Sequence, residues 1–179
     1  AGSKRNILAH YDLGNDFYNL WLDPSMSYSS ALFGTDPQSL QQAQRQKCLR
    51  LLEMLDPKPG DTILEVGCGW GGLAEIAATE FGCRVHGITL SPSQLAWSQA
   101  RAQQKGFADL ADFSLTDYRD VRGQYDHIVS IEMFEAVGER FWPGYFAQLH
   151  KCLKPGGRAA VQTITIANER FDAYRRGTD

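Results

Sequence analysis

The spacing of apolar residues changes near residue 60 of this chain. Before that point the inward positions recur every three or four residues, as on one face of an α-helix, at Leu40, Ala43, Lys47/Cys48, Leu51, Leu52 and Leu55. After that point, short apolar runs alternate with helical stretches. The pattern therefore predicts one long helix, followed by a unit in which strands and helices alternate.

The limits of the first helix follow from residues with known capping preferences. Asp36 is a candidate N-cap and Pro37 suits the first helical turn, so we expect a helix from there to Asp56. The prolines and glycine in residues 57–61 break the helix. Residues 4–35 are rich in aromatic side chains, show no helical or strand period, and are expected to be irregular.

The second part of the chain predicts five strands. We place them at residues 62–66, 83–88, 112–115, 125–131 and 158–166, with helices at 71–81, 92–105 and 141–153 and a turn at 154–157. Strands joined by helical crossovers pair in parallel and are covered on both faces. The expected fold class is α/β: a Rossmann-like, mostly parallel sheet (residues 57–179) with a helical cap over the active site (residues 1–56), forming one compact domain.

Composition narrows the function. A net charge of −3 gives no basic face for nucleic acid, and no apolar run approaches the ~20 residues of a membrane span. The four cysteines are widely spaced, without a Cys-x-x-Cys pair, and the histidines show no ligand spacing. We therefore expect buried, reduced thiols, no metal site and a cytoplasmic protein.

A glycine-rich loop follows the first predicted strand. Gly67, Gly69 and Gly72 satisfy the G-x-G-x-x-G spacing of dinucleotide sites, where glycines let the backbone approach a ligand closely. Glu65 lies two places before the first glycine, as in the E-x-G-x-G signature of methyltransferases. The second strand also lacks the terminal acid that NAD enzymes use to bind ribose. These features favour S-adenosylmethionine over NAD.

The third predicted strand is followed by Thr116, Asp117 and Tyr118, an acid and an aromatic ring suited to the amino group and face of adenine. Class I methyltransferase sheets normally carry two strands after the fifth, the last forming an antiparallel hairpin. This chain stops at Asp179, so we expect a fragment that lacks those two strands.

Six blocks of sequence together resemble the cyclopropane-fatty-acyl-phospholipid synthase and mycolic acid cyclopropane synthase family. They are HYDLGNDFY (10–18) with its continuation at 26–29, the glycine loop at 64–72, GITLSPSQ (87–94), DYRD (117–120) and SIEMFEAVG (130–138). The resemblance implies a methyltransferase that transfers a methyl or methylene group from S-adenosylmethionine to the double bond of an unsaturated fatty acyl chain of a phospholipid. The cofactor product would be S-adenosylhomocysteine.

The resemblance also implies the cofactor contacts. The residues expected at the methionine end are Tyr28, Ser29, Gly67 and Gly69, together with Glu65 from the glycine signature. Those expected around the ribose and adenine are Thr89, Leu90, Gln94, Asp117, Tyr118 and Arg119. Ser130 and Ile131 would lie beside the sulfonium.

Glu135 is the main catalytic candidate, because it follows the fourth strand at the edge where such sheets bind ligands. Methylation of a double bond leaves positive charge on carbon, which a fixed carboxylate stabilises or helps to deprotonate. Alternatively, Glu135 caps or pairs with the following helix, and Glu132 is the functional acid.

The resemblance further suggests a bicarbonate ion as the base, but three positions differ from the family pattern. Ser30 replaces a cysteine, Ala136 a histidine and Gln162 a second histidine. Ser30 and Gln162 still form hydrogen bonds, so we include them among the catalytic candidates.

Two other functions stay open. One is a small-molecule N-methyltransferase, which would have a compact acidic pocket rather than a long apolar tunnel. The other is a cofactor-binding module without catalysis. A phospholipid substrate would also require peripheral contact with the inner membrane face, although no basic amphipathic helix supports it. The sequence leaves the oligomeric state open.

Overall fold

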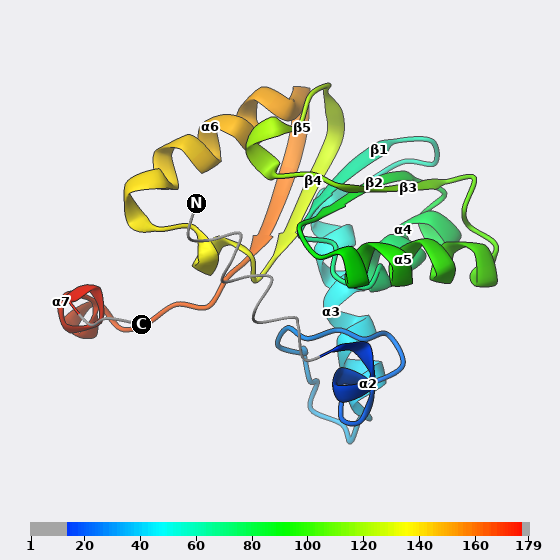
Figure 1. Ribbon diagram of the computed structural model, residues 1–179, viewed down its shortest axis with the longest axis horizontal. Helices are drawn as coiled ribbons and strands as arrows, with labels where there is room; N and C mark the ends of the chain where they lie inside the picture. Colours follow the sequence, from blue (N-terminus) through cyan, green and yellow to red (C-terminus); the bar gives the residue numbers. More distant parts are fainter. Residues whose placement is uncertain (1–13, 177–179) are drawn as a thin grey trace.

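A computed structural model describes residues 14–176, which form a parallel sheet with helices around it (Figure 1). The sequence block at 10–18 therefore lies partly outside the described residues. The strands are β1 (Thr62–Val66), β2 (Arg84–Thr89), β3 (Ala111–Leu115), β4 (Tyr125–Ile131) and β5 (Leu153–Gln162). The α-helices are α2 (Gly14–Asn19), α3 (Leu40–Leu55), α4 (Gly72–Phe81), α5 (Pro92–Lys105), α6 (Trp142–Cys152) and α7 (Asn168–Arg176), and short 3₁₀ helices are η1 (Tyr118–Asp120), η2 (Phe134–Ala136) and η3 (Glu139–Phe141).

The strand order in the sheet is β3-β2-β1-β4-β5, and every pairing is parallel. From β1 the chain moves outward to β2 and β3, and it then returns to the other side of β1 to form β4 and β5. Ile63 of β1 lies opposite Val85 of β2 and His127 of β4. The order therefore reverses at β1, and the carboxyl ends of β1 and β4 flank the crevice in which such sheets bind ligands.

Two apolar cores cover the two faces of the sheet. Alternate residues of a strand point to opposite faces, so Ile63 packs with α3, α4 and α5 while Leu64 packs with α6. Figure 1 shows α4 and α5 on one side of the sheet and α6 on the other. The predicted Rossmann-like α/β class with helices on both faces is confirmed. None of the helices in residues 14–176 is long and apolar enough to cross a membrane.

The first long helix begins at Leu40, so the predicted N-cap at Asp36 is wrong. Ser39 caps the helix instead, because it forms a reciprocal capping box with Gln42. The Ser39 hydroxyl accepts a hydrogen bond from the Gln42 backbone N–H at 3.2 Å, and the Gln42 side chain accepts one from the Ser39 N–H at 2.8 Å. Two backbone donors are satisfied here, which an isolated Asp-Pro pair does not achieve.

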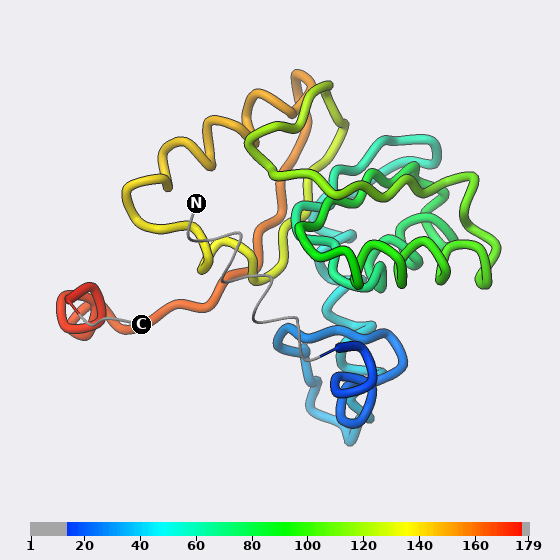
Figure 2. Tube along the Cα trace, in the orientation of Figure 1, coloured from blue at the N-terminus to red at the C-terminus, as the bar shows by residue number. Residues whose placement is uncertain are grey.

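The fifth strand also differs from its predicted limits of 158–166. Leu153 already pairs with Tyr125, and pairing resumes where Arg158 lies opposite His127, so the expected turn at 154–157 is a bulge within β5. Gly157 is needed there, because a Cβ at this position would lie 2.6 Å from the Asp126 carbonyl oxygen. The strand ends at Gln162, after which the chain leads away to α7 (Figure 2).

Residues 4–35 were expected to be irregular, yet their described part, from residue 14, includes the short helix α2. This helix is held by tertiary contacts rather than by its own sequence period. The Trp70 indole N–H donates to the Asn15 side-chain oxygen at 2.8 Å, and the Trp70 ring lies 5.2 Å from the buried Tyr18 ring. The aromatic segment therefore packs on the glycine loop.

Candidate active site

Two adjoining cavities lie at the carboxyl edge of the sheet. The first has a volume of about 300 Å³ and extends toward the segment 25–29 and α3; the second, of about 140 Å³, extends toward the end of β2 and Tyr118. They share six lining residues, so they form one continuous cleft over the crevice between β1 and β4. The shared residues are Gly67, Gly69, Gln94, Ile131, Glu132 and Ala136.

The glycine loop forms the floor of this cleft. Gly67 and Gly69 have φ angles of 82° and 53°, in the left-handed region that favours glycine. A Cβ on Gly67 would also lie 3.1 Å from the Met133 side chain. The Gly67 and Cys68 N–H groups both donate to the Ile88 carbonyl, at 3.0 and 2.9 Å, which fixes the loop against β2. The bare backbone thus faces the cleft, as the glycine spacing predicted.

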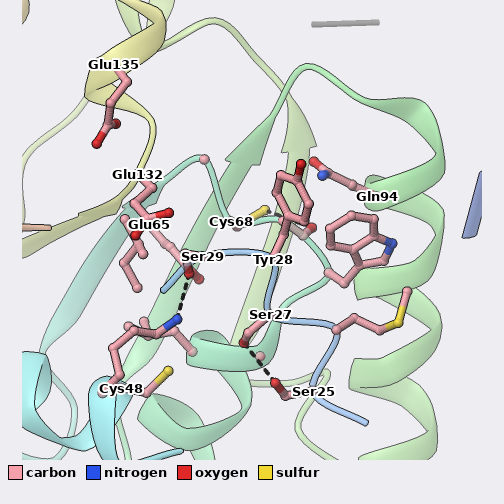
Figure 3. Close-up of a pocket in the computed structure, with 18 of the residues that line it drawn as sticks. Ser25, Ser27, Tyr28, Ser29, Cys48, Glu65, Cys68, Gln94, Glu132 and Glu135 are labelled. Atoms are coloured by element: carbon pink, nitrogen blue, oxygen red, sulfur yellow. Dashed lines mark hydrogen bonds between the residues drawn. The ribbon is translucent and has the colours of Figure 1, made fainter. Parts of the chain in front are cut away.

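The segment that carries Tyr28 and Ser29 is fixed by two side chains of α3. The Gln44 amide donates to the carbonyl oxygens of Ser27 and Ser29, at 3.2 and 2.7 Å. The Lys47 ammonium donates to the Ser29 hydroxyl at 2.6 Å, the hydrogen bond that the dashed line at Ser29 marks in Figure 3, and to the Gln44 side-chain oxygen at 2.5 Å. Tyr28 and Ser29 therefore line the first cavity in a defined position.

A buried carboxylate and a buried ammonium face the first cavity. Glu65 is 4% exposed, and burial raises its pKa to about 8; Lys47 is also 4% exposed, and burial lowers its pKa. The Oε2 atom of Glu65 has no hydrogen-bond partner within residues 14–176. An acceptor held this way suits a cationic ligand group such as an ammonium.

Polar groups at the end of β2 border the second cavity. The Thr89 hydroxyl donates to the Gln94 side-chain oxygen at 2.7 Å and accepts from the Ser91 N–H at 3.1 Å. Thr89, Leu90, Gln94 and Tyr118 all line this cavity, where the resemblance placed the ribose and adenine. No acidic side chain ends β2, in agreement with the absence of a ribose-binding acid in the sequence.

Three predicted cofactor residues do not line either cavity. Asp117 caps η1 and binds the Arg119 guanidinium at 2.6 Å, while Ser130 is fully buried and donates to the Val66 carbonyl at 3.2 Å. The contact of Asp117, Arg119 and Ser130 with a cofactor stays a prediction.

The three predicted catalytic residues fall into two groups. The Glu132 Oε1 atom accepts hydrogen bonds from the Ser30 N–H and from the Gln162 side-chain amide, each at 3.0 Å. Glu135 instead binds the segment after β5, accepting from the Thr163 hydroxyl at 2.8 Å and from the Ile164 N–H. Both carboxylates line the first cavity, and Figure 3 shows that Glu132 lies near Glu65 and Ser29 whereas Glu135 lies further along the wall.

Sequence reasoning missed Lys47, although a signal was present. Lys47 and Cys48 fall on the inward stripe of the α3 pattern, and a lysine at such a position is rarely buried without a partner. The four cysteines are buried and form no disulfide, as predicted for the thiols. Within residues 14–176, no three or more His, Cys, Asp or Glu side chains gather in a way that suits a metal ion.

Comparison with known proteins agrees with this fold. The chain is 44% identical to tuberculostearic acid methyltransferase of Mycobacterium tuberculosis and 43% identical to cyclopropane-fatty-acyl-phospholipid synthase of Escherichia coli, over 97% and 87% of this chain. It spans only 42% and 39% of those two relatives. A crystal structure of mycolic acid cyclopropane synthase complexed with SAH and CTAB matches 97% of this chain and 61% of that one, with a TM-score of 0.89 and 34% identity.

Residues 2–178, nearly the whole chain, match the sequence family described as "Mycolic acid cyclopropane synthetase". The expected resemblance is therefore confirmed, and the chain belongs to the mycolic acid cyclopropane synthetase family.

Proposed function

We propose that the protein is a methyltransferase that uses S-adenosylmethionine to alkylate the double bond of an unsaturated fatty acyl chain of a phospholipid. The observation that carries this proposal is the continuous cleft over Gly67 and Gly69, where a backbone floor, a buried carboxylate and a polar end of β2 meet. The names of the family and of both curated relatives support the acyl substrate.

The residues of the cleft fit this cofactor. Glu65 offers an unpaired buried oxygen for the ammonium of the methionine part, Ser29 and Tyr28 border the same cavity, and Tyr118 borders the other. When bound, S-adenosylmethionine supplies an electrophilic methyl group on a sulfonium. Ile131, which lines both cavities, would border that group, and the hydrogen bonds from Gln44 and Lys47 of α3 hold the covering segment 27–29 in place.

We also propose that residues before β1 cap the active site and contact a membrane surface peripherally. The segment between α2 and α3 exposes several apolar side chains, among them Leu20 at 83% and Phe33 at 57%. Exposed apolar groups beside an acyl-binding cleft suit contact with lipid.

A small-molecule N-methyltransferase is the second candidate, and one observation favours it. Glu65, Glu132 and Glu135 all line the first cavity, and such a concentration of carboxylates suits an amine substrate. The relatives favour the acyl substrate instead, so we place the amine second.

The test is to incubate the purified protein with methyl-labelled S-adenosylmethionine and vesicles of unsaturated phospholipid, and to analyse the lipids by mass spectrometry. We expect the label in the acyl chains. Label only in the amine headgroups, or in an added amine, would favour the second candidate. Calorimetry with S-adenosylmethionine tests the cofactor site itself, and folded protein that binds none would refute both.

A further inference from the structure

Glu132 is bound by Ser30 and Gln162, two residues at positions where the family pattern implies contacts with a bicarbonate ion. Ser30 and Gln162 stand at two of the positions expected to hold that ion, and both already donate to the Glu132 Oε1 atom, at 3.0 Å each. Because both donors are already bound to the Glu132 carboxylate, the residues present do not fit a bound bicarbonate ion. We propose that Glu132 is the base of the reaction and that the protein needs no bicarbonate; this inference rests on the proposed function.

The backbone at Glu132 supports a functional role. Its φ angle of 46° lies in the left-handed region, which costs a non-glycine residue about 1 kcal/mol or more. Such a conformation persists only where surrounding contacts enforce it. Here the Glu132 N–H donates to the Gln162 carbonyl at 2.9 Å, so backbone and side chain are both fixed to the end of β5.

The position of Glu132 also distinguishes it from Glu135. Glu132 lines both cavities, so it lies where the methyl donor and the acceptor meet, whereas Glu135 lines only the first. Glu132 is partly buried, while Glu135 is exposed and its Oε1 atom is engaged by Thr163 and Ile164. Glu135 thus fixes the wall of the cleft, and Glu132 faces the reacting atoms.

The chemical step balances with a single carboxylate. The π electrons of the acyl double bond form a bond to the methyl carbon, while the electron pair of the carbon–sulfur bond stays on sulfur. Positive charge remains on the neighbouring chain carbon, which makes the adjacent C–H bonds acidic. The Glu132 carboxylate takes one proton, the C–H pair closes a cyclopropane ring or forms a new double bond, and the Glu132 carboxylic acid later releases the proton to solvent.

The experiment compares Glu132→Gly and Glu132→Gln with the wild type, in buffer stripped of bicarbonate and in buffer supplied with it. Glycine adopts a positive φ without strain, so Glu132→Gly removes the carboxylate without endangering the fold, while glutamine keeps the size of the side chain. Glu53→Gln, on the exposed side of α3, is the matched control. Labelled product and S-adenosylmethionine affinity are measured for each protein.

We expect wild-type turnover to be the same in both buffers. Both Glu132 variants should lose about a hundredfold or more of their turnover in stripped buffer while they still bind S-adenosylmethionine, and Glu53→Gln should match the wild type. Wild-type turnover that stops without bicarbonate, or a Glu132→Gln variant that retains full turnover, would overturn the inference while leaving the proposed function intact. A wild type that labels no acyl chain would instead overturn the proposed function, and this inference with it.

Discussion

At the scale of single residues, the burial of Glu65 makes the folded protein less stable as the pH rises, because the buried carboxyl then ionises. Its pKa in the folded protein, raised to about 8 by burial, exceeds the ordinary glutamate value of 4.5. The folded state therefore binds a proton more tightly than the unfolded state. The contribution of this group to stability is therefore greatest below pH ~4.5, and it falls as the pH rises toward ~8.

We accordingly expect Glu65→Gln to be more stable than the wild type above pH 8 and to lose that advantage toward pH 5. The amide keeps the shape of the protonated acid but never ionises. Thermal unfolding of both proteins across this pH range, without cofactor, measures the difference. If the stabilities of the two proteins differed by the same amount at every pH, burial would not raise the pKa of Glu65.

The pair Ser30 and Gln162 gives a second prediction at this scale. Ser30 contributes its backbone N–H to Glu132, which alanine retains, whereas Gln162 contributes its side chain. A hydrogen bond to a charged group is worth about 1.5–3 kcal/mol. Gln162→Leu should therefore reduce turnover by roughly ten- to a hundredfold, and Ser30→Ala by clearly less. Steady-state kinetics with labelled cofactor decide this, and a larger loss in Ser30→Ala would assign the role to its hydroxyl.

At the scale of secondary structure elements, the start of α3 offers a direct test of its cap. Ser39→Ala removes the hydroxyl that accepts the Gln42 N–H, and loss of such a cap costs about 1 kcal/mol. Asp36→Ala, at the position that sequence preference favoured, should change stability very little. Urea unfolding monitored by circular dichroism measures both. If Asp36→Ala were the more destabilising of the two, the capping box would not define this helix end.

The sequence predicts the elements well where the apolar pattern alone decides them. The limits of β1 and β4 match, since both strands are buried and bounded by polar or glycine residues. It fails where a contact with a distant segment decides, as at the β5 bulge, where Gly157 packs against Asp126. No local pattern encodes such a contact.

The same distinction holds for the candidate site. The glycine loop was predictable because its residues are adjacent in sequence and their chemistry depends on the backbone. The hydrogen bonds to Glu132 were not predictable, because their donors lie far away in the sequence: Ser30 is 102 positions from Glu132 and Gln162 is 30 positions from it. Ser30 and Gln162 were each identified as candidates, but only the fold shows that they bind the same carboxylate.

At the scale of the whole molecule, the segment 23–29 is held over the cleft by contacts from both α3 and α5. Gln44 and Lys47 of α3 bind Ser27 and Ser29, while Arg101 of α5 donates to the Pro24 carbonyl at 2.9 Å. Arg101 is buried and is also paired with Glu75 of α4 at 3.2 Å. One side chain thus connects α4, α5 and the segment that borders the first cavity.

We expect Arg101→Met to loosen this segment while leaving the sheet intact. The methionine fills apolar space but donates no hydrogen bond to Pro24, and the Glu75 side chain, 27% exposed, remains partly accessible to water. Hydrogen exchange by mass spectrometry should show faster exchange across residues 23–29 and little change in β1 and β4. S-adenosylmethionine should slow the exchange again, because a ligand that binds the closed form shifts the population toward it, and its affinity should fall accordingly. Arg45→Met, which breaks the exposed Arg45–Glu80 pair on α3 and α4, is the control. If it loosened residues 23–29 as much, the effect would come from general weakening of the helical layer and not from the Arg101 contact.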